Sequence, residues 1–103
     1  MTGPQKIGFW SNLKAVNIGK QRQFLKEGSK YRVIKNFTDY DGTTHNIGEI
    51  WTFLAYSFNC YDNGVQWFIT FDDTQEWSIP LWLDDNQQKE VDCYPETYIE
   101  LYD

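Results

Sequence analysis

The middle of the chain constrains the fold most, because three strand-like runs are separated there by two turn signals. The runs cover residues 31–37, 49–58 and 65–71. In the third run every second residue from Val65 is apolar, as expected for a strand with one buried face. Asn63-Gly64 directly precedes it and is typical of a hairpin, because both residues tolerate the positive φ that a tight turn requires. The segment therefore predicts antiparallel strands joined by short turns.

Short strand-like segments continue to the end of the chain. Residues 76–82 alternate again, but Pro80 has no backbone N–H, so this strand should lie at a sheet edge or carry a bulge. Residues 84–92 predict a polar loop, and residues 94–102 predict a short turn followed by a closing strand. Several short strands at close spacing predict a mainly β fold. We expect a small, strongly curved antiparallel sheet or a small barrel of about five strands.

Charge divides the chain into two parts. Residues 1–35 carry a charge of +7 and residues 36–103 a charge of −13, within a net charge of −6. We expect a basic N-terminal extension over residues 1–29, with a short helix at 20–27 closed by Gly28, and an acidic small β-barrel domain over residues 30–103. A tethered basic segment meets its own acidic domain at high effective concentration. We therefore favour contact between the two parts over binding of an external polyanion.

Aromatic residues make up 18% of the chain, with five Trp, seven Tyr and seven Phe. Each such ring buries roughly 150–250 Å², so these side chains can form a core without a cofactor, and we expect none. No apolar run reaches the roughly 18 residues that a membrane span requires, and no signal-peptide pattern is present. We expect a cytoplasmic protein that does not enter a membrane, with Cys60 and Cys93 as free thiols.

Asp39 and Asp41, followed by Gly42, invite interpretation as a calcium loop. The helix–loop–helix register fails, however. With Gly42 at the sixth loop position, the first and twelfth positions fall on Phe37 and Gly48, where carboxylates are required. An irregular calcium site is the alternative. We interpret the two aspartates as residues that bond the amides of their own turn, and we predict no metal site.

His45 is the only histidine of the chain. A zinc site needs several His or Cys ligands, and Cys60 and Cys93 are isolated in the sequence. Either cysteine could pair with His45 as nucleophile and base, but no nucleophile elbow, glycine-rich phosphate loop or Cys-x-x-Cys accompanies them. We expect His45 to bond a neighbouring carboxylate or carbonyl, and we predict no catalytic residue.

One string carries a resemblance to a known family. Gly28, Tyr31 and Val33 form the pattern Gly-x-x-Tyr-x-Val, and the residues that complete the string are Phe37, Asp39-Tyr40-Asp41-Gly42, His45, Gly48-Glu49 and Trp51. Over residues 24–102 the chain resembles a family of small bacterial domains known only as a domain of unknown function. The resemblance implies no activity.

A second resemblance is at the level of the fold. An acidic loop over residues 39–48 is followed by Gly48-Glu49, Trp67 and a terminal segment with Pro95, Tyr98 and Ile99. This order is similar to that of the Src-homology-3-type small barrel, and it implies a barrel shape. The Ala-Leu-Tyr-Asp-Tyr opening of that family is absent here, and fold alone does not carry function.

These observations favour a non-enzymatic protein or peptide binding module that uses exposed aromatic residues ringed by acids. The predicted binding residues are Tyr40, Asp41, His45, Trp67, Trp82 and Tyr98. The acidic domain would repel phosphates, which disfavours nucleic acid as a partner. One alternative is an acidic immunity-type inhibitor that masks the basic site of a toxin or nuclease. Another is a small ligand-binding barrel or hydrolase with a pocket near His45. The sequence leaves the oligomeric state open.

Overall fold

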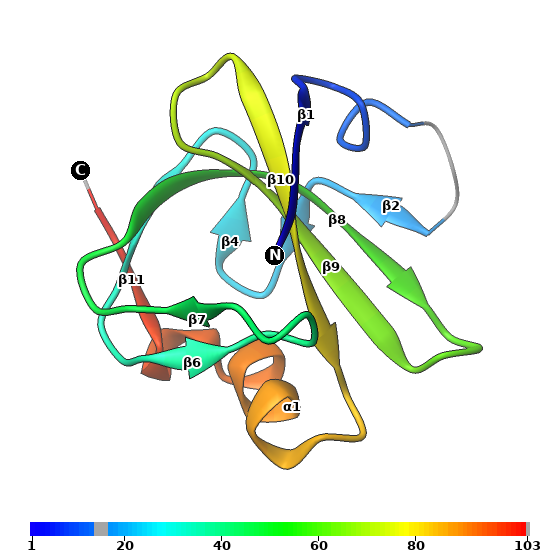
Figure 1. The fold of residues 1–103 in the computed structure, drawn as a ribbon, viewed down its shortest axis with the longest axis vertical. Coiled ribbons are helices and arrows are strands. Elements are labelled where there is room, and N and C mark those ends of the chain that lie inside the picture. The colour runs from blue at the N-terminus through cyan, green and yellow to red at the C-terminus, as the bar shows by residue number, and fades with distance from the viewer. Residues whose placement is uncertain (14–16, 103) are drawn as a thin grey trace.

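The computed structural model describes residues 1–13 and 17–102 and shows a mainly β fold (Figure 1). Strands of this part form one antiparallel sheet in the spatial order β1 (Thr2–Lys6), β10 (Gln75–Trp82), β9 (Gly64–Thr70), β8 (Ile50–Asn59), β5 (Lys30–Val33) and β11 (Ile99–Leu101). The short strand β2 (Ile18–Gly19) joins the same sheet by pairing with β8 beside β5. Two short hairpins lie outside the sheet, β3 (Gln21–Arg22) with β4 (Leu25–Lys26) and β6 (Phe37–Thr38) with β7 (Thr44–His45).

Strands β8, β9 and β10 form the centre of the sheet, and their register follows the predicted hairpin. Asn63 adopts a φ of 49° in the β8–β9 turn, which confirms the Asn-Gly signal. Tyr56 of β8 lies opposite Trp67 of β9, which lies opposite Ile79 of β10. Val65, Trp67 and Ile69 are all buried on the inner face. The alternation of the third predicted run is therefore confirmed.

The inner face is covered by the β6–β7 hairpin and by the helix α1 (Asn86–Cys93), with the short 3₁₀ turn η1 (Pro95–Thr97) behind it (Figure 1). Phe37 of β6 and Val91 of α1 join the core there. The predicted polar loop at 84–92 is wrong, since most of it is helical. Val91 is the buried apolar side chain of this helix, so the segment has no apolar periodicity that a helix prediction could use. Asp85 caps the helix by accepting a bond from the Gln88 amide at 3.0 Å.

The outer face of the same three strands is covered over part of its area by the N-terminal segment. The Trp10 ring stacks on Phe68 at 5.7 Å between centroids and 7° between planes, and Ser11 beside it is buried. Further along the strands, a row of Ser57, Gln66 and Pro80 stays on the open side. Partial cover by the N-terminal segment is what leaves a hollow on this face.

Two predictions about architecture are wrong. The helix at 20–27 is replaced by the β3–β4 hairpin, whose turn places Gln23 at a φ of 56°; Leu25 is fully buried there, and Gly28 has a positive φ as expected. Burial of one leucine and the pairing of Arg22 with the body of the domain override the local helix propensity. The helix lies near the C-terminal end of the chain instead. In the part of the chain that the structure describes, the sheet ends at β1 and β11, and it does not close into a barrel.

The edge position predicted for the strand that carries Pro80 is wrong, because β10 lies between β1 and β9. Strand β1 pairs with β10 only as far as Ser78, so Pro80 lies beyond its reach and no ladder bond to that side is lost. The Pro80 carbonyl accepts the Tyr40 amide at 2.9 Å, which holds the turn between β6 and β7 (residues 39–43, hereafter the acidic turn) against β10.

Within residues 1–13 and 17–102, no helix has the length and apolar character needed to cross a membrane.

Basic residues of the N-terminal part contact acidic residues of the body, as the charge distribution predicts. Arg22 donates two bonds to Asp92 of α1, from Nε at 2.9 Å and from Nη2 at 2.6 Å, and its guanidinium lies 5.1 Å from the centre of the Tyr56 ring. Asp92 is buried and also accepts the Trp67 indole N–H at 3.2 Å. One carboxylate therefore links β3, β9 and α1.

Candidate functional site

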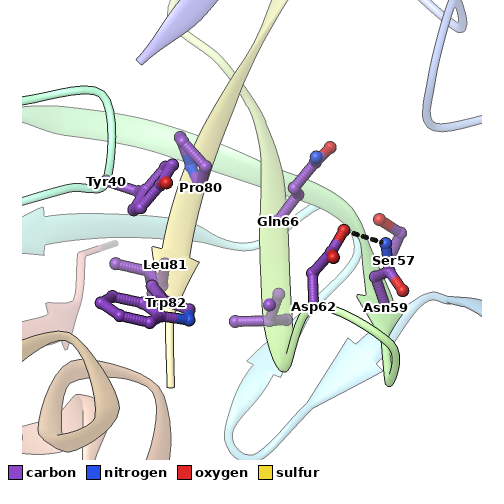
Figure 2. Close-up of a pocket in the computed structure, with 10 residues that line it drawn as sticks. Tyr40, Ser57, Asn59, Asp62, Gln66, Pro80, Leu81 and Trp82 are labelled. Atoms are coloured by element: carbon purple, nitrogen blue, oxygen red, sulfur yellow. Dashed lines mark hydrogen bonds between the residues drawn. The ribbon is translucent and has the colours of Figure 1, made fainter. Parts of the chain in front are cut away.

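Two adjoining hollows lie on the open part of the outer sheet face. The larger has a volume of about 360 Å³ and is lined by side chains of β8, β9, β10 and the acidic turn (Figure 2). The second, of about 350 Å³, shares Tyr40, Gln66 and Pro80 with the first and is also lined by Trp10 and Asp41. Ligand sites in proteins occupy roughly 300–1,000 Å³, so the pair of hollows, hereafter the groove, has the size of a binding site.

One wall of the groove is aromatic. Tyr40 and Trp82 pack edge to face, with 6.1 Å between ring centroids and 67° between planes, and Pro80 lies beside them (Figure 2). Tyr40 is 63% exposed and Trp82 is 42% exposed. The Trp82 amide donates to the Gln88 side chain at 2.8 Å, which anchors this strand end to α1. Large rings that stay exposed while their backbone is fixed are a common feature of binding surfaces.

The opposite wall is polar. Figure 2 shows Gln66, Asp62, Ser57 and Asn59 across from the aromatic pair. The Asn59 side-chain amide donates to Asp62 at 2.9 Å, and the Ser78 hydroxyl donates to the Gln66 carbonyl oxygen at 3.2 Å. Asp62 is exposed and reaches the groove from the β8–β9 turn. The wall therefore offers side-chain amides, hydroxyls and a carboxylate.

A second polar constellation lies inside the fold, around His45. The imidazole Nδ1 lies 2.7 Å from Glu49 Oε2, and Nε2 lies 2.8 Å from Asp39 Oδ2. His45 is fully buried and its ring stacks on Phe37 at 4.7 Å. Two carboxylates accept bonds at the two nitrogens, so the imidazolium form, which donates from both, satisfies the geometry. The prediction that His45 bonds a neighbouring carboxylate is confirmed.

The charges of this cluster stabilise one another. Burial lowers the pKa of His45, but the bonds to Asp39 and Glu49 outweigh it, and the pKa is raised above its usual 6.5. Burial raises the pKa of Asp39, whereas the bonds from His45, from the N-terminal amine at 2.7 Å and from the Thr43 amide bring it below 3.8. Asp39 also accepts the amides of Asp41 and Thr43 through Oδ1. The interpretation of Asp39 as a turn-bonding residue is thus confirmed, whereas the Asp41 carboxylate accepts the Thr2 hydroxyl at 2.6 Å instead.

The arrangement does not form a metal site. Asp39 and Glu49 reach opposite edges of the imidazole, so their oxygens do not converge on one point. Over the ranges 1–13 and 17–102, no three His, Cys, Asp or Glu side chains gather as metal ligands would. Cys60 is exposed, Cys93 is partly buried, and both are free thiols.

The structure separates the six predicted binding residues into two groups. Tyr40, Asp41 and Trp82 line the groove. Three others, His45, Trp67 and Tyr98, are buried and hold the core together. Tyr98 donates its hydroxyl to Glu90 at 3.2 Å and lies under Lys35, whose ammonium is 4.9 Å from the ring centre. The sequence does not separate exposed rings from buried ones at these positions, because the side that a ring faces follows from the strand register.

The residues missed by sequence reasoning are the polar ones of the open face, namely Ser57, Asn59, Gln66 and Ser78. A signal for them does exist in the sequence. Each occupies an outward position in an alternating strand, and the pairing of Ser57 with Gln66 follows from the Asn63-Gly64 hairpin. The strand pattern does not predict how much of the outer sheet face the N-terminal segment covers.

Comparison with known proteins places the chain in a family. Residues 10–103 match the family described as domain of unknown function (DUF3601). The chain belongs to this family. The resemblance noted over residues 24–102 is therefore confirmed, and it extends toward the N-terminus. The family's description assigns no activity.

The fold of this family member also occurs in a solved structure. An integron cassette protein from the mobile metagenome of Vibrio cholerae is similar to it, with a TM-score of 0.77 and 25% sequence identity. The similarity covers 82% of this chain and 93% of that protein. Among curated proteins, none matches the chain.

Proposed function

We propose that the protein is a non-enzymatic binding module for a protein or peptide partner, and that the groove on the outer sheet face is its site. The observation that carries the proposal is the exposed Tyr40–Trp82 pair, which faces a wall of hydrogen-bonding side chains across a hollow of about 360 Å³. The backbone of both rings is fixed, since the Tyr40 amide donates to Pro80 and the Trp82 amide to Gln88. An aromatic anchor beside polar groups is the usual composition of a protein interface.

The ionisable cluster supports a binding role over a catalytic one. His45, Asp39 and Glu49 are already bonded to one another, and His45 is fully buried. Neither hollow is lined by His45. A general base must reach a substrate proton within hydrogen-bond distance, and this imidazole has both nitrogens committed to the fold. A ligand in the groove would meet Gln66 and Asp62 instead.

The test is photo-crosslinking in cell extract, with the crosslinker placed at residue 66 in the groove and the captured proteins quantified by mass spectrometry. We expect a partner whose yield falls at least about tenfold in the double variant Tyr40→Ser/Trp82→Ser, because aromatic anchors dominate interface energies. Tyr94→Ser is the matched control, since Tyr94 is 61% exposed but lies at the end of α1, away from the groove. Yields that are equal in all three proteins would refute the proposal.

An acidic inhibitor of a basic toxin or nuclease is a second candidate. It is favoured by the acidic turns of the body: Asp72 and Asp73 are exposed at the β9–β10 turn, and Asp84 is exposed near the start of α1. In this case affinity should depend on the acids of residues 72–92 and fall steeply with salt, while the groove rings should be dispensable. The crosslinking comparison above separates the two candidates.

A further inference from the structure

The charge of the groove has one sign. Two carboxylates, Asp41 and Asp62, line its hollows, and within the described residues no Lys, Arg or His lines either one. Asp41 is engaged by the Thr2 hydroxyl at 2.6 Å and by the N-terminal amine at 3.2 Å. Asp62, by contrast, accepts a bond from the neutral Asn59 amide. The groove thus presents a carboxylate that a cation of the described chain does not neutralise.

Two arginine side chains of the protein itself each lie between a carboxylate and an aromatic ring. Arg22 pairs with Asp92 and lies over the rings of Tyr56 and Phe58, at 5.1 Å and 5.7 Å from their centres. Arg32 pairs with Glu100 and lies 5.3 Å from the centre of the Tyr102 ring. In both places a guanidinium is held between a carboxylate and an aromatic face, an arrangement that suits its planar, weakly hydrated charge.

The groove repeats the two fixed parts of that arrangement. Tyr40 and Trp82 supply aromatic faces on one wall, and Asp62 supplies the carboxylate on the other (Figure 2). We propose that the groove binds an arginine side chain of the partner polypeptide, with its guanidinium against the Tyr40–Trp82 pair and its N–H groups directed to Asp62. This inference rests on the proposed function, because it names the partner chemistry of the same site.

Arginine fits better than the other side chains that a partner could offer. An anionic group would meet two carboxylates, and a neutral one would leave Asp62 without a counter-charge. A lysine ammonium is more strongly hydrated and cannot pair bidentately with a carboxylate while stacking on a ring. The adjoining second hollow, with Ser78 and Gln66 on its polar side, gives the backbone of the partner segment room to continue along the sheet.

The experiment is an NMR titration of the full-length, ¹⁵N-labelled protein with the blocked pentapeptide Gly-Ser-Arg-Ser-Gly. The same peptide with citrulline, which keeps the shape of arginine but has no charge, is the matched ligand. We expect saturable shifts at the Trp82 indole N–H and at the amides of residues 64–66, and a dissociation constant about tenfold or more higher for citrulline, since a charge-assisted bond is worth at least that factor.

Two variants locate the carboxylate. Asp62→Asn keeps the acceptor for Asn59 and should weaken the arginine peptide about tenfold while leaving the citrulline peptide unchanged. Asp73→Asn removes the same charge at the far end of β9 and β10, where Asp73 has a φ of 64° that asparagine tolerates. It should have no effect on either peptide.

The outcomes separate this inference from the proposed function. Equal binding of both peptides, shifts that map to residues 72–75, or no shift at all would each overturn the arginine assignment. If groove-dependent crosslinking persists in any of those cases, the module function stands and its partner has another chemistry. If crosslinking is also independent of Tyr40 and Trp82, both proposals fail.

Discussion

Asp92→Ala tests whether one buried carboxylate holds three parts of the fold together. Asp92 is 1% exposed and accepts two bonds from Arg22 and one from the Trp67 indole. Truncation leaves the Trp67 N–H without a partner in a fully buried position, which costs about 1–3 kcal/mol. It also removes the ion pair with Arg22, whose side chain is 23% exposed and can therefore rehydrate in part.

The expected loss follows from these two contributions. Hydrogen bonds to charged groups are worth about 1.5–3 kcal/mol, and partial exposure of Arg22 places this pair at the lower end. We expect Asp92→Ala to lower the free energy of unfolding by about 3 kcal/mol, a large share of the roughly 5–15 kcal/mol typical of a domain. Alanine favours a helix by a few tenths of a kcal/mol over aspartate, so the measured loss of stability is a lower bound on the free energy contributed by the Asp92 contacts.

Urea denaturation followed by tryptophan fluorescence measures this loss. Glu96→Ala is the control, because Glu96 is an exposed acid of η1 and its removal should change stability by less than about 0.5 kcal/mol. In an Arg22→Met background, Asp92→Ala should cost about 1–2 kcal/mol less, since no cation is then left unpaired. A loss below about 1 kcal/mol in the parent, or no coupling between the two sites, would refute the reasoning.

Two further predictions concern stability. Because the pKa of His45 is raised in the folded state, the contribution of its protonated form to stability is fully present below pH 6.5 and is lost as the pH rises through the folded pKa. The free energy of unfolding, measured by urea titration, should therefore fall with rising pH in the parent protein and not in His45→Gln. A pH dependence that survives the substitution would contradict this origin. Gly19→Ala should destabilise the fold by about 1–3 kcal/mol, because a Cβ at residue 19 overlaps the ring of Tyr56 and overpacking has that cost. Gly42→Ala is the control and should lose less stability, since a Cβ there meets no atom and only the positive φ is unfavourable. Equal thermal midpoints of the two variants would argue against the close contact.

The sequence predicts the strands of this fold well where a turn signal and an alternating pattern agree. Asn63-Gly64 and the run after it fix the β8–β9 hairpin and its register. Residues 20–27, predicted as a helix, form the β3–β4 hairpin, and residues 84–92, predicted as a polar loop, are mostly helical. In the first, burial of Leu25 decides the structure; in the second, polar residues form a helix through the Asp85 cap and the Asp92 contacts. The burial of Leu25 and the contacts of Asp92 depend on residues far away in the sequence, so the local pattern does not predict them.

The candidate site was predicted in part for a similar reason. Tyr40 and Trp82, which the sequence predicts as binding residues, line the groove, but Trp67 and Tyr98, predicted alongside them, lie in the core. A ring on a strand can face either way, and its side follows only from the register of the whole sheet. The barrel expectation failed at the edges of the sheet, because the sequence pattern does not say whether β1 and β11 meet.

The position of α1 and β11 in the chain has a consequence for how the protein is made. Both elements lie after Leu83, yet Val91 and Ile99 complete the core against which Trp67 packs. Until the segment after Leu83 has left the ribosome, the inner faces of β8, β9 and β10 therefore lack this part of their cover. Apolar strand faces that are exposed at that stage favour aggregation.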